Sequence, residues 1–147
     1  MNTSVTNHLL LGGALCALVA CGGEKERSES SEHVASSAAG APVTPAPGGR
    51  MIEIEMFSNE KGNYFEPSEI TARQGDVLQF ELKTGVHNVN FLPDSNPGKT
   101  GLPAPTPLLQ LPDQTIEVAV TMGPGTYYFH CDPHAALGMK GHLTVTK

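Results

Sequence analysis

The stretch of sequence that decides the fold is Cys131-Asp132-Pro133-His134-Ala135-Ala136-Leu137-Gly138-Met139. It carries a thiol, an imidazole and a thioether on Cys131, His134 and Met139, and His87 stands 44 positions before the cysteine. Two imidazoles and one thiolate in a trigonal arrangement, with a weak axial methionine, form the site that holds copper in electron-transfer proteins. The donor set therefore predicts one copper ion that cycles between Cu(I) and Cu(II).

Zinc is the rival metal, because it also binds cysteine and histidine. Thioether sulfur is a poor ligand for zinc and a good one for copper, and copper stands above zinc in the order of affinities. Each residue taken alone has a plainer explanation, since a lone buried cysteine or loop methionine usually serves packing. Their combination in one run favours copper. His130 and His142 each neighbour inward-facing residues, so we expect both to face water and neither to bind the metal.

Around this run, apolar and polar side chains alternate with the period of two that is typical of half-buried strands. The alternation predicts strands near residues 52–56, 65–70 (interrupted by a proline), 78–82, 86–92, 116–120, 127–131 and 143–145. Gln74–Asp76 and Gly123–Gly125 are predicted turns, and Pro93–Pro112, with six prolines, is a predicted irregular loop. We expect an all-β, two-sheet antiparallel sandwich of about seven to eight strands.

This scaffold explains how distant donors could meet. Cys131 ends one predicted strand, His134 lies in the following loop, and Met139 begins the approach to the last strand. His87 belongs to a neighbouring strand. The short loop can then curl three donors around one point, with Pro133 restricting its backbone.

The segments Tyr127–His134 and Gly138–Gly141 resemble the signature of plastocyanin and pseudoazurin, small blue-copper proteins of the cupredoxin family. Gly75-Asp76 and His87-Asn88-Val89 match this pattern as well. The resemblance covers residues 50–147 and implies a cupredoxin-like Greek-key sandwich.

The same resemblance implies a role for each site residue. His87 and His134 would bind copper through imidazole nitrogen, Cys131 through thiolate, and Met139 as the axial ligand. Asn88 would hydrogen-bond near the cysteine sulfur and link the two ligand loops.

His134 is the implied gateway for electrons, in a small apolar patch formed with Pro133, Ala135, Ala136 and Leu137. Through it the protein would dock weakly and transiently with cytochromes or copper enzymes. His130 stands where plastocyanins usually carry a tyrosine used in partner docking, so the sequence does not support a second electron route there.

All four coordination positions come from the chain, which leaves none for a substrate. The sequence therefore predicts an outer-sphere electron carrier, acting as a monomer, and not an enzyme. A second hypothesis is copper binding or delivery at the cell envelope, which tends to use clustered methionines or histidines. Here Met1, Met51, Met56 and Met122 are dispersed. The net charge of -6 argues against nucleic-acid binding.

The N-terminus predicts export and anchoring. Residues 1–20 are a predicted lipoprotein-type signal peptide, because the apolar stretch Leu9–Ala20 is shorter than the roughly 20 residues that span a bilayer. Leu18-Val19-Ala20-Cys21 resembles a lipobox, so Cys21 is the predicted lipidation site. Such leaders usually begin with basic residues, but no lysine or arginine precedes Leu9–Ala20. An ordinary secretory signal is the alternative. Residues 21–49 are a predicted flexible Gly/Ser/Glu/Pro linker, and residues 50–147 the folded domain. We therefore expect a periplasmic protein, anchored by lipid to the outer membrane.

Overall fold

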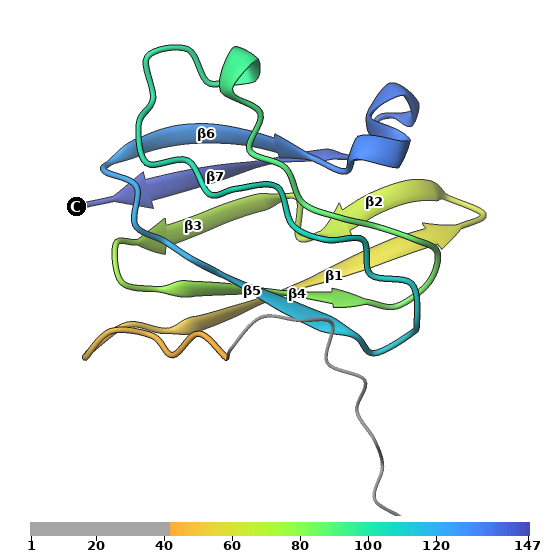
Figure 1. The fold of residues 1–147 in the computed structure, drawn as a ribbon, viewed down its shortest axis with the longest axis horizontal. Coiled ribbons are helices and arrows are strands. Elements are labelled where there is room, and N and C mark those ends of the chain that lie inside the picture. The colour runs from red at the N-terminus through yellow and green to blue at the C-terminus, as the bar shows by residue number, and fades with distance from the viewer. Residues whose placement is uncertain (1–41) are drawn as a thin grey trace, which may run out of the picture. The chain divides into compact units, whose positions relative to one another are not determined.

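The computed structural model describes residues 42–147, which form two β-sheets with almost no helix (Figure 1). The strands are β1 (Met51–Asn59), β2 (Gly62–Glu66), β3 (Glu69–Arg73), β4 (Val77–Leu82), β5 (Thr115–Ala119), β6 (Gly125–His130) and β7 (Lys140–Thr146), with two 3-10 helices, η1 (Pro93–Ser95) and η2 (Asp132–Leu137). One sheet has the order β2-β1-β4-β5 and the other β3-β7-β6. This confirms the predicted all-β class and strand number. The predicted signal peptide, the lipidation site at Cys21 and most of the linker lie outside the described residues.

Two strand pairs run parallel, so the expectation of purely antiparallel sheets was wrong. β1 is parallel to β4, and β3 is parallel to β7, whereas the pairs β1–β2, β4–β5 and β6–β7 are antiparallel. The cause lies at the predicted proline break, Pro67, where the chain leaves the first sheet after β2 and enters the second as β3. It then returns as β4 in the direction of β1, and such a crossover makes the pair parallel.

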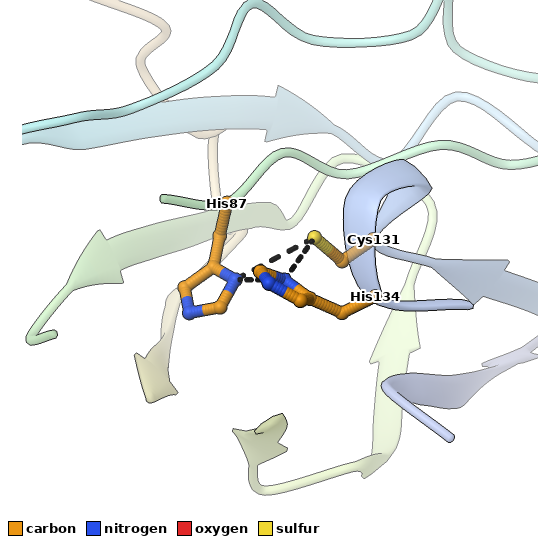
Figure 2. A group of neighbouring side chains, drawn as sticks. All are labelled: His87, Cys131 and His134. Carbon is orange, nitrogen blue, oxygen red and sulfur yellow. Dashed lines mark hydrogen bonds between the residues drawn. The ribbon is translucent and has the colours of Figure 1, made fainter. Parts of the chain in front are cut away.

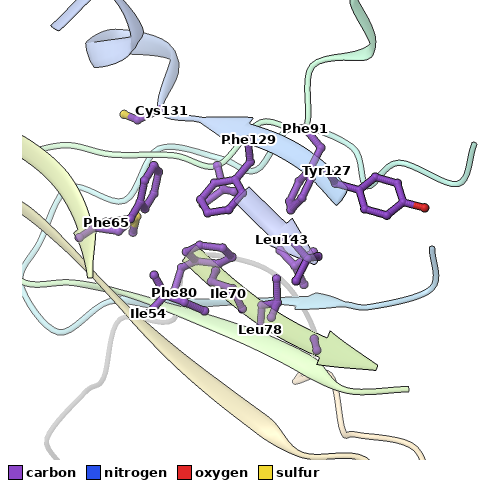
Figure 3. Packing of buried hydrophobic residues seen from close by; sticks show 14 of the residues in the cluster. Ile54, Phe65, Ile70, Leu78, Phe80, Phe91, Tyr127, Phe129, Cys131 and Leu143 are labelled. Carbon is purple, nitrogen blue, oxygen red and sulfur yellow. The ribbon is translucent and has the colours of Figure 1, made fainter. Parts of the chain in front are cut away.

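The core lies between the two sheets and is built from the inward-facing residues of the alternating strands (Figure 3). Its centre is an aromatic cluster around Phe129 of β6. The Phe129 ring centroid lies 5.0 Å from that of Phe65, 5.8 Å from Phe80 and 5.3 Å from Phe91. These separations are typical of favourable aromatic pairs. Because Phe129 precedes Cys131 by two residues, the cluster fixes the end of β6 at which the cysteine lies.

The segment 86–92 is not a continuous strand, contrary to expectation. It is extended and buries His87, Val89 and Phe91, but it pairs through two isolated bridges, His87 with Leu109 and Asn90 with His130. The neighbouring loop holds prolines at 103, 105 and 107. Proline has no N–H group to donate, so a regular ladder cannot form along it.

The predicted turn at Gln74–Asp76 is confirmed and ties β1 to β4. Gly75 has a positive φ of 95°, and the buried carboxylate of Asp76 accepts hydrogen bonds from the backbone N–H groups of Arg50 and Arg73 and from the Arg50 guanidinium. Burial acts to raise the pKa of the Asp76 carboxyl, but these hydrogen bonds and the Arg50 charge outweigh it, and the net pKa is lowered. Ionised Asp76 therefore stabilises the turn.

The described part of the chain holds no helix of the length and apolar character needed to cross a membrane.

Candidate metal centre

Three predicted ligands converge at one end of the sandwich (Figure 2). His87 and Cys131 are fully buried and His134 is half-buried. Nδ1 of His87 lies 3.1 Å from Nδ1 of His134, and Sγ of Cys131 lies 3.5 Å from each of these nitrogens. Two imidazoles and one sulfur thus face a common point.

The spacing of these atoms fits one metal ion. A point equidistant from them lies about 2 Å from each, close to the about 2.0–2.3 Å bonds that a first-row ion makes to imidazole and thiolate. A trigonal set of two nitrogens and one sulfur suits copper. The donors therefore enclose a position of the right size and chemistry for one copper ion.

The Cys131–Met139 segment is held by its own backbone. The His134 N–H donates to the Cys131 carbonyl at 3.1 Å, and the Met139 N–H donates to the His134 carbonyl at 3.2 Å. The Cys131 N–H in turn donates to the Met139 carbonyl at 3.2 Å. Gly138 closes η2 with a φ of 90°, a conformation that favours glycine. Met139 is fully buried beside the cysteine and histidine backbones, and its thioether stays the predicted axial ligand.

His87 is oriented by residues that the sequence reasoning did not single out. Its Nε2 lies 3.0 Å from the Thr84 carbonyl oxygen and 3.2 Å from the Ser58 hydroxyl oxygen. A carbonyl only accepts hydrogen bonds, so Nε2 carries the proton and Nδ1 offers its lone pair to the metal. Burial and the neighbouring His134 lower the pKa of His87, which favours this neutral form. Gly85, two residues before His87 and with a φ of 97°, leaves room for the ring, because a Cβ atom there would lie 2.9 Å from His87 Nε2.

The electrostatics at Cys131 favour a protonated thiol in the metal-free protein. Burial raises the pKa of the thiol and the charge of Asp132 adds to this, against hydrogen bonds from the backbone N–H groups of Asn88 and His134 to the sulfur. Copper binding would displace the proton, since the thiolate is the ligand form.

Asn88 hydrogen-bonds to Asp132, the residue that follows Cys131. Besides its backbone N–H at the sulfur, its side-chain Oδ1 accepts the Asp132 N–H at 2.8 Å, and its Nδ2 donates to Asp132 Oδ2 at 2.6 Å. Asn88 thus joins the His87 segment to the segment that follows Cys131. Sequence reasoning missed Asp132 because a single aspartate carries no pattern.

His130 is not exposed, contrary to expectation. It points away from the core between the sheets but is only 9% exposed, because Asp132 and Tyr128 cover it. His142 is outward-facing as predicted, with its side chain 40% exposed and its Nδ1 2.9 Å from Glu69 Oε1. Neither belongs to the His87–Cys131–His134 group.

The residues of the predicted gateway form a partly exposed apolar surface. Pro133, Ala136 and Leu137 are exposed and Ala135 is half-buried, beside the half-buried His134. Leu137 is 68% exposed, the largest exposed fraction among the large apolar side chains of residues 42–147.

Comparison with known proteins points to one family. Residues 52–146 match the family described as copper binding proteins, plastocyanin/azurin family. The chloroplastic plastocyanin of Oryza sativa subsp. indica is 34% identical over 114 residues, which cover 76% of this chain and 73% of that protein. The plastocyanin of Prochlorothrix hollandica is 37% identical over 98 residues, covering 64% of this chain and 72% of that protein.

Solved structures show the same likeness. A mutant plastocyanin of a fern superposes with a TM-score of 0.51 at 34% identity, covering 65% of this chain and 100% of that one. A pseudoazurin from a Sinorhizobium species superposes with a TM-score of 0.50 at 27% identity, covering 67% of this chain and 75% of that one.

Proposed function

The chain belongs to the plastocyanin/azurin family of copper-binding proteins, and from this premise we propose that it is an extracytoplasmic type 1 copper protein that carries single electrons between redox partners. The observation that carries the proposal is the convergence of His87 Nδ1, Cys131 Sγ and His134 Nδ1 around a point of metal-bonding size. Copper would supply the change between Cu(I) and Cu(II).

The protein contributes a cage that resists rearrangement. The His87 ring is held by Thr84 and Ser58. Cys131 and His134 lie in one short segment whose backbone hydrogen bonds hold it together. Met139, buried next to them, is the proposed axial ligand. A full set of protein ligands leaves no position for a substrate, which supports electron transfer rather than catalysis.

Electrons would enter and leave through His134. Its ring is half-buried, its Nδ1 belongs to the group of metal-facing donors, and Pro133, Ala136 and Leu137 beside it in the chain are exposed. An apolar patch of this kind suits brief docking with another redox protein, where contacts are small and weak. From Arg50 onward the chain holds 11 acidic and 7 basic residues, an excess that would steer a basic partner modestly. Cytochromes or copper enzymes are the proposed partners.

The proposed location is the periplasm, with Cys21 lipidated in the outer membrane. The support is the N-terminal sequence: an apolar stretch, a lipobox-like Leu18–Cys21, and a polar tether. A Cys21→Ser variant, expressed from its own start, should move from the detergent phase to the aqueous phase on phase partition. Retention of that variant in the detergent phase would contradict the anchor.

Repeated redox cycling distinguishes this function from copper delivery. The copper-loaded protein should pass through many rounds of reduction and reoxidation in the presence of a Cu(I) chelator with its metal retained. Transfer of copper to the chelator in the first reduced state would instead support a delivery protein.

A further inference from the structure

His87 is fully buried, so an electron that passes through its ring must reach the surface by way of neighbouring residues. Through its second ring nitrogen, His87 meets the β1–β2 hairpin. Its Nε2 lies 3.2 Å from the Ser58 hydroxyl, which donates in turn to the Asn63 side chain on the opposite strand. The Ser58 N–H also donates at 3.0 Å to the Thr84 carbonyl, the group that holds His87 Nε2. The hairpin is therefore hydrogen-bonded directly to a predicted metal ligand.

The residue before Ser58 belongs to an aromatic pair on the outer face of the sheet. Phe57 of β1 and Tyr64 of β2 are cross-strand partners, and their rings stack with centroids 5.2 Å apart and planes 23° apart. Both residues are half-buried, whereas Met56, the neighbour of Phe57, faces the core. Asn59 Nδ2 donates to the Tyr64 hydroxyl at 2.9 Å, which fixes that ring. An ordered pair of rings thus begins one residue from the hydrogen bond to His87.

The same face of the sheet is negatively charged. Glu55 and Glu66 form the next cross-strand pair on this face, beside the aromatic pair. Five glutamates on the strands of this sheet alternate with core-facing residues and so share the face: Glu53, Glu55, Glu66, Glu81 and Glu117. Lys83 balances part of the charge, since its Nζ lies 3.4 Å from a Glu55 oxygen and 2.5 Å from a Glu81 oxygen. Lysine and arginine side chains bind carboxylates by charge and aromatic rings by cation–π attraction. The face therefore suits a basic partner.

We propose that the Phe57–Tyr64 pair is a second electron path out of the copper centre, used by a positively charged redox partner that docks on the outer face of β1 and β2. The path runs from His87 through the Ser58 hydrogen bond and the adjoining backbone to Phe57, and across the stack to Tyr64. It is separate from the gateway at His134, which lies beside exposed apolar residues. The site loses one electron and the partner gains it, while no bond forms or breaks and no proton moves. This inference rests on the proposed copper function and adds a second docking face to it.

Paramagnetic line broadening tests the docking face in the full chain without metal. Hexaamminechromium(III), a redox-inert trication, should broaden the NMR signals of Phe57 and Tyr64 before those of Tyr128, which lies on the other sheet. The anion hexacyanochromate(III) should spare Phe57 and Tyr64. The double variant Glu55→Gln/Glu66→Gln, which removes the neighbouring charges, should lose the selective broadening.

Stopped-flow oxidation of the copper-loaded chain tests the path itself. Tris(phenanthroline)cobalt(III), a cation, and hexacyanoferrate(III), an anion, each accept one electron. Tyr64→Leu removes a ring of the stack, so it should slow oxidation by the cobalt complex severalfold and leave oxidation by hexacyanoferrate(III) unchanged. Tyr64→Phe keeps the ring and should keep both rates. The double variant Glu55→Gln/Glu66→Gln should slow the cobalt reaction roughly tenfold at low salt, since local charge changes association rates by this order.

Tyr128→Leu is the matched control, because it removes a half-buried tyrosine from the other sheet. It should leave both rates unchanged. A slower cobalt reaction in Tyr128→Leu but not in Tyr64→Leu would overturn the inference, because it would put the path on the other sheet.

Other results would overturn the inference as well. These are an unchanged cobalt rate in Tyr64→Leu, a loss that both oxidants share equally, and broadening of the Tyr64 signals by hexacyanochromate(III). Loss of the red copper band in Tyr64→Leu would mean that the ring supports the site rather than carries electrons. A chain that takes up no copper would refute the proposed function together with the path, whereas an intact copper band with unchanged rates refutes the path alone.

Discussion

Replacing Gly85 with alanine tests whether the backbone beside His87 sets the geometry of the metal site. Gly85 has a φ of 97°, and a Cβ atom there would lie 2.9 Å from His87 Nε2 and still closer to the Ser58 hydroxyl. Ordinary contacts between heavy atoms of this kind are about 3.5–4.0 Å. The His87 ring would have to move by roughly half an ångström to one ångström to relieve the contact, and Nδ1, the donor atom, moves with it.

The cost has two parts. A side chain in left-handed backbone costs about 1–2 kcal/mol, and an added methyl group in a packed site costs about 1–3 kcal/mol. We therefore expect Gly85→Ala to lower the free energy of unfolding by about 2–5 kcal/mol. Displacement of a ligand by loss of its support should weaken copper binding by about 10–100-fold.

Gly48→Ala is the control. Gly48 has a similar φ of 83°, but a Cβ there meets nothing within 4 Å. This variant should lose about 1–2 kcal/mol of stability and bind copper as the unmodified protein does. Urea unfolding of the metal-free proteins gives the first quantity, and competition with a chelator gives the second. Equal copper affinities for both alanine variants would refute the reasoning.

Three further predictions concern the fold and the docking surface. Asp76→Asn should lower the free energy of unfolding by about 1.5–3 kcal/mol at pH 7. Because the folded-state pKa of Asp76 is lowered, the stability that its carboxylate adds is complete above the unfolded pKa of about 4 and is lost as the pH falls through the lower folded pKa. In urea unfolding, the difference in stability between the variant and the unmodified protein should therefore narrow below about pH 4, and a difference that stays constant to about pH 2 would contradict this. Phe129→Ala should lower the free energy of unfolding by about 3–5 kcal/mol, and a urea-unfolding loss below about 1 kcal/mol would refute its place at the centre of the core. Leu137→Asp should slow electron exchange with a partner in stopped-flow measurements while leaving the copper spectrum intact. Met51→Asp, a similar change at the start of β1, should leave the rate of exchange unchanged. Equal rates for the two variants would contradict the proposal that electrons pass through the surface around His134.

Much of the fold could be predicted because alternation in this chain agrees with burial. Apolar residues of the expected strands 52–56, 78–82 and 143–145 are buried, among them Ile54, Phe80, Leu143 and Val145. The parallel pairs could not be predicted from alternation, since the period is the same whichever way a neighbour runs. Segment 86–92 alternates like a strand, but the prolines opposite it deny it a continuous partner.

The donor residues of the site could be predicted from their chemical types, but their supports could not. His87, Cys131 and His134 carry rare side chains in a specific spacing, whereas Ser58 and Thr84 are common residues that matter through position alone. The same limit explains the error at His130: a residue on the outer face of a sheet is expected to be exposed, and sequence does not reveal that Asp132 and Tyr128 fold over it.

The most direct measurement of the central claim is the absorption spectrum of the purified, copper-loaded protein beside that of its Cys131→Ala variant. The trigonal site predicts an intense thiolate-to-copper band in the red for the unmodified protein and no such band for the variant. A colourless protein that takes up zinc and not copper, or a band that survives the loss of Cys131, would contradict the account.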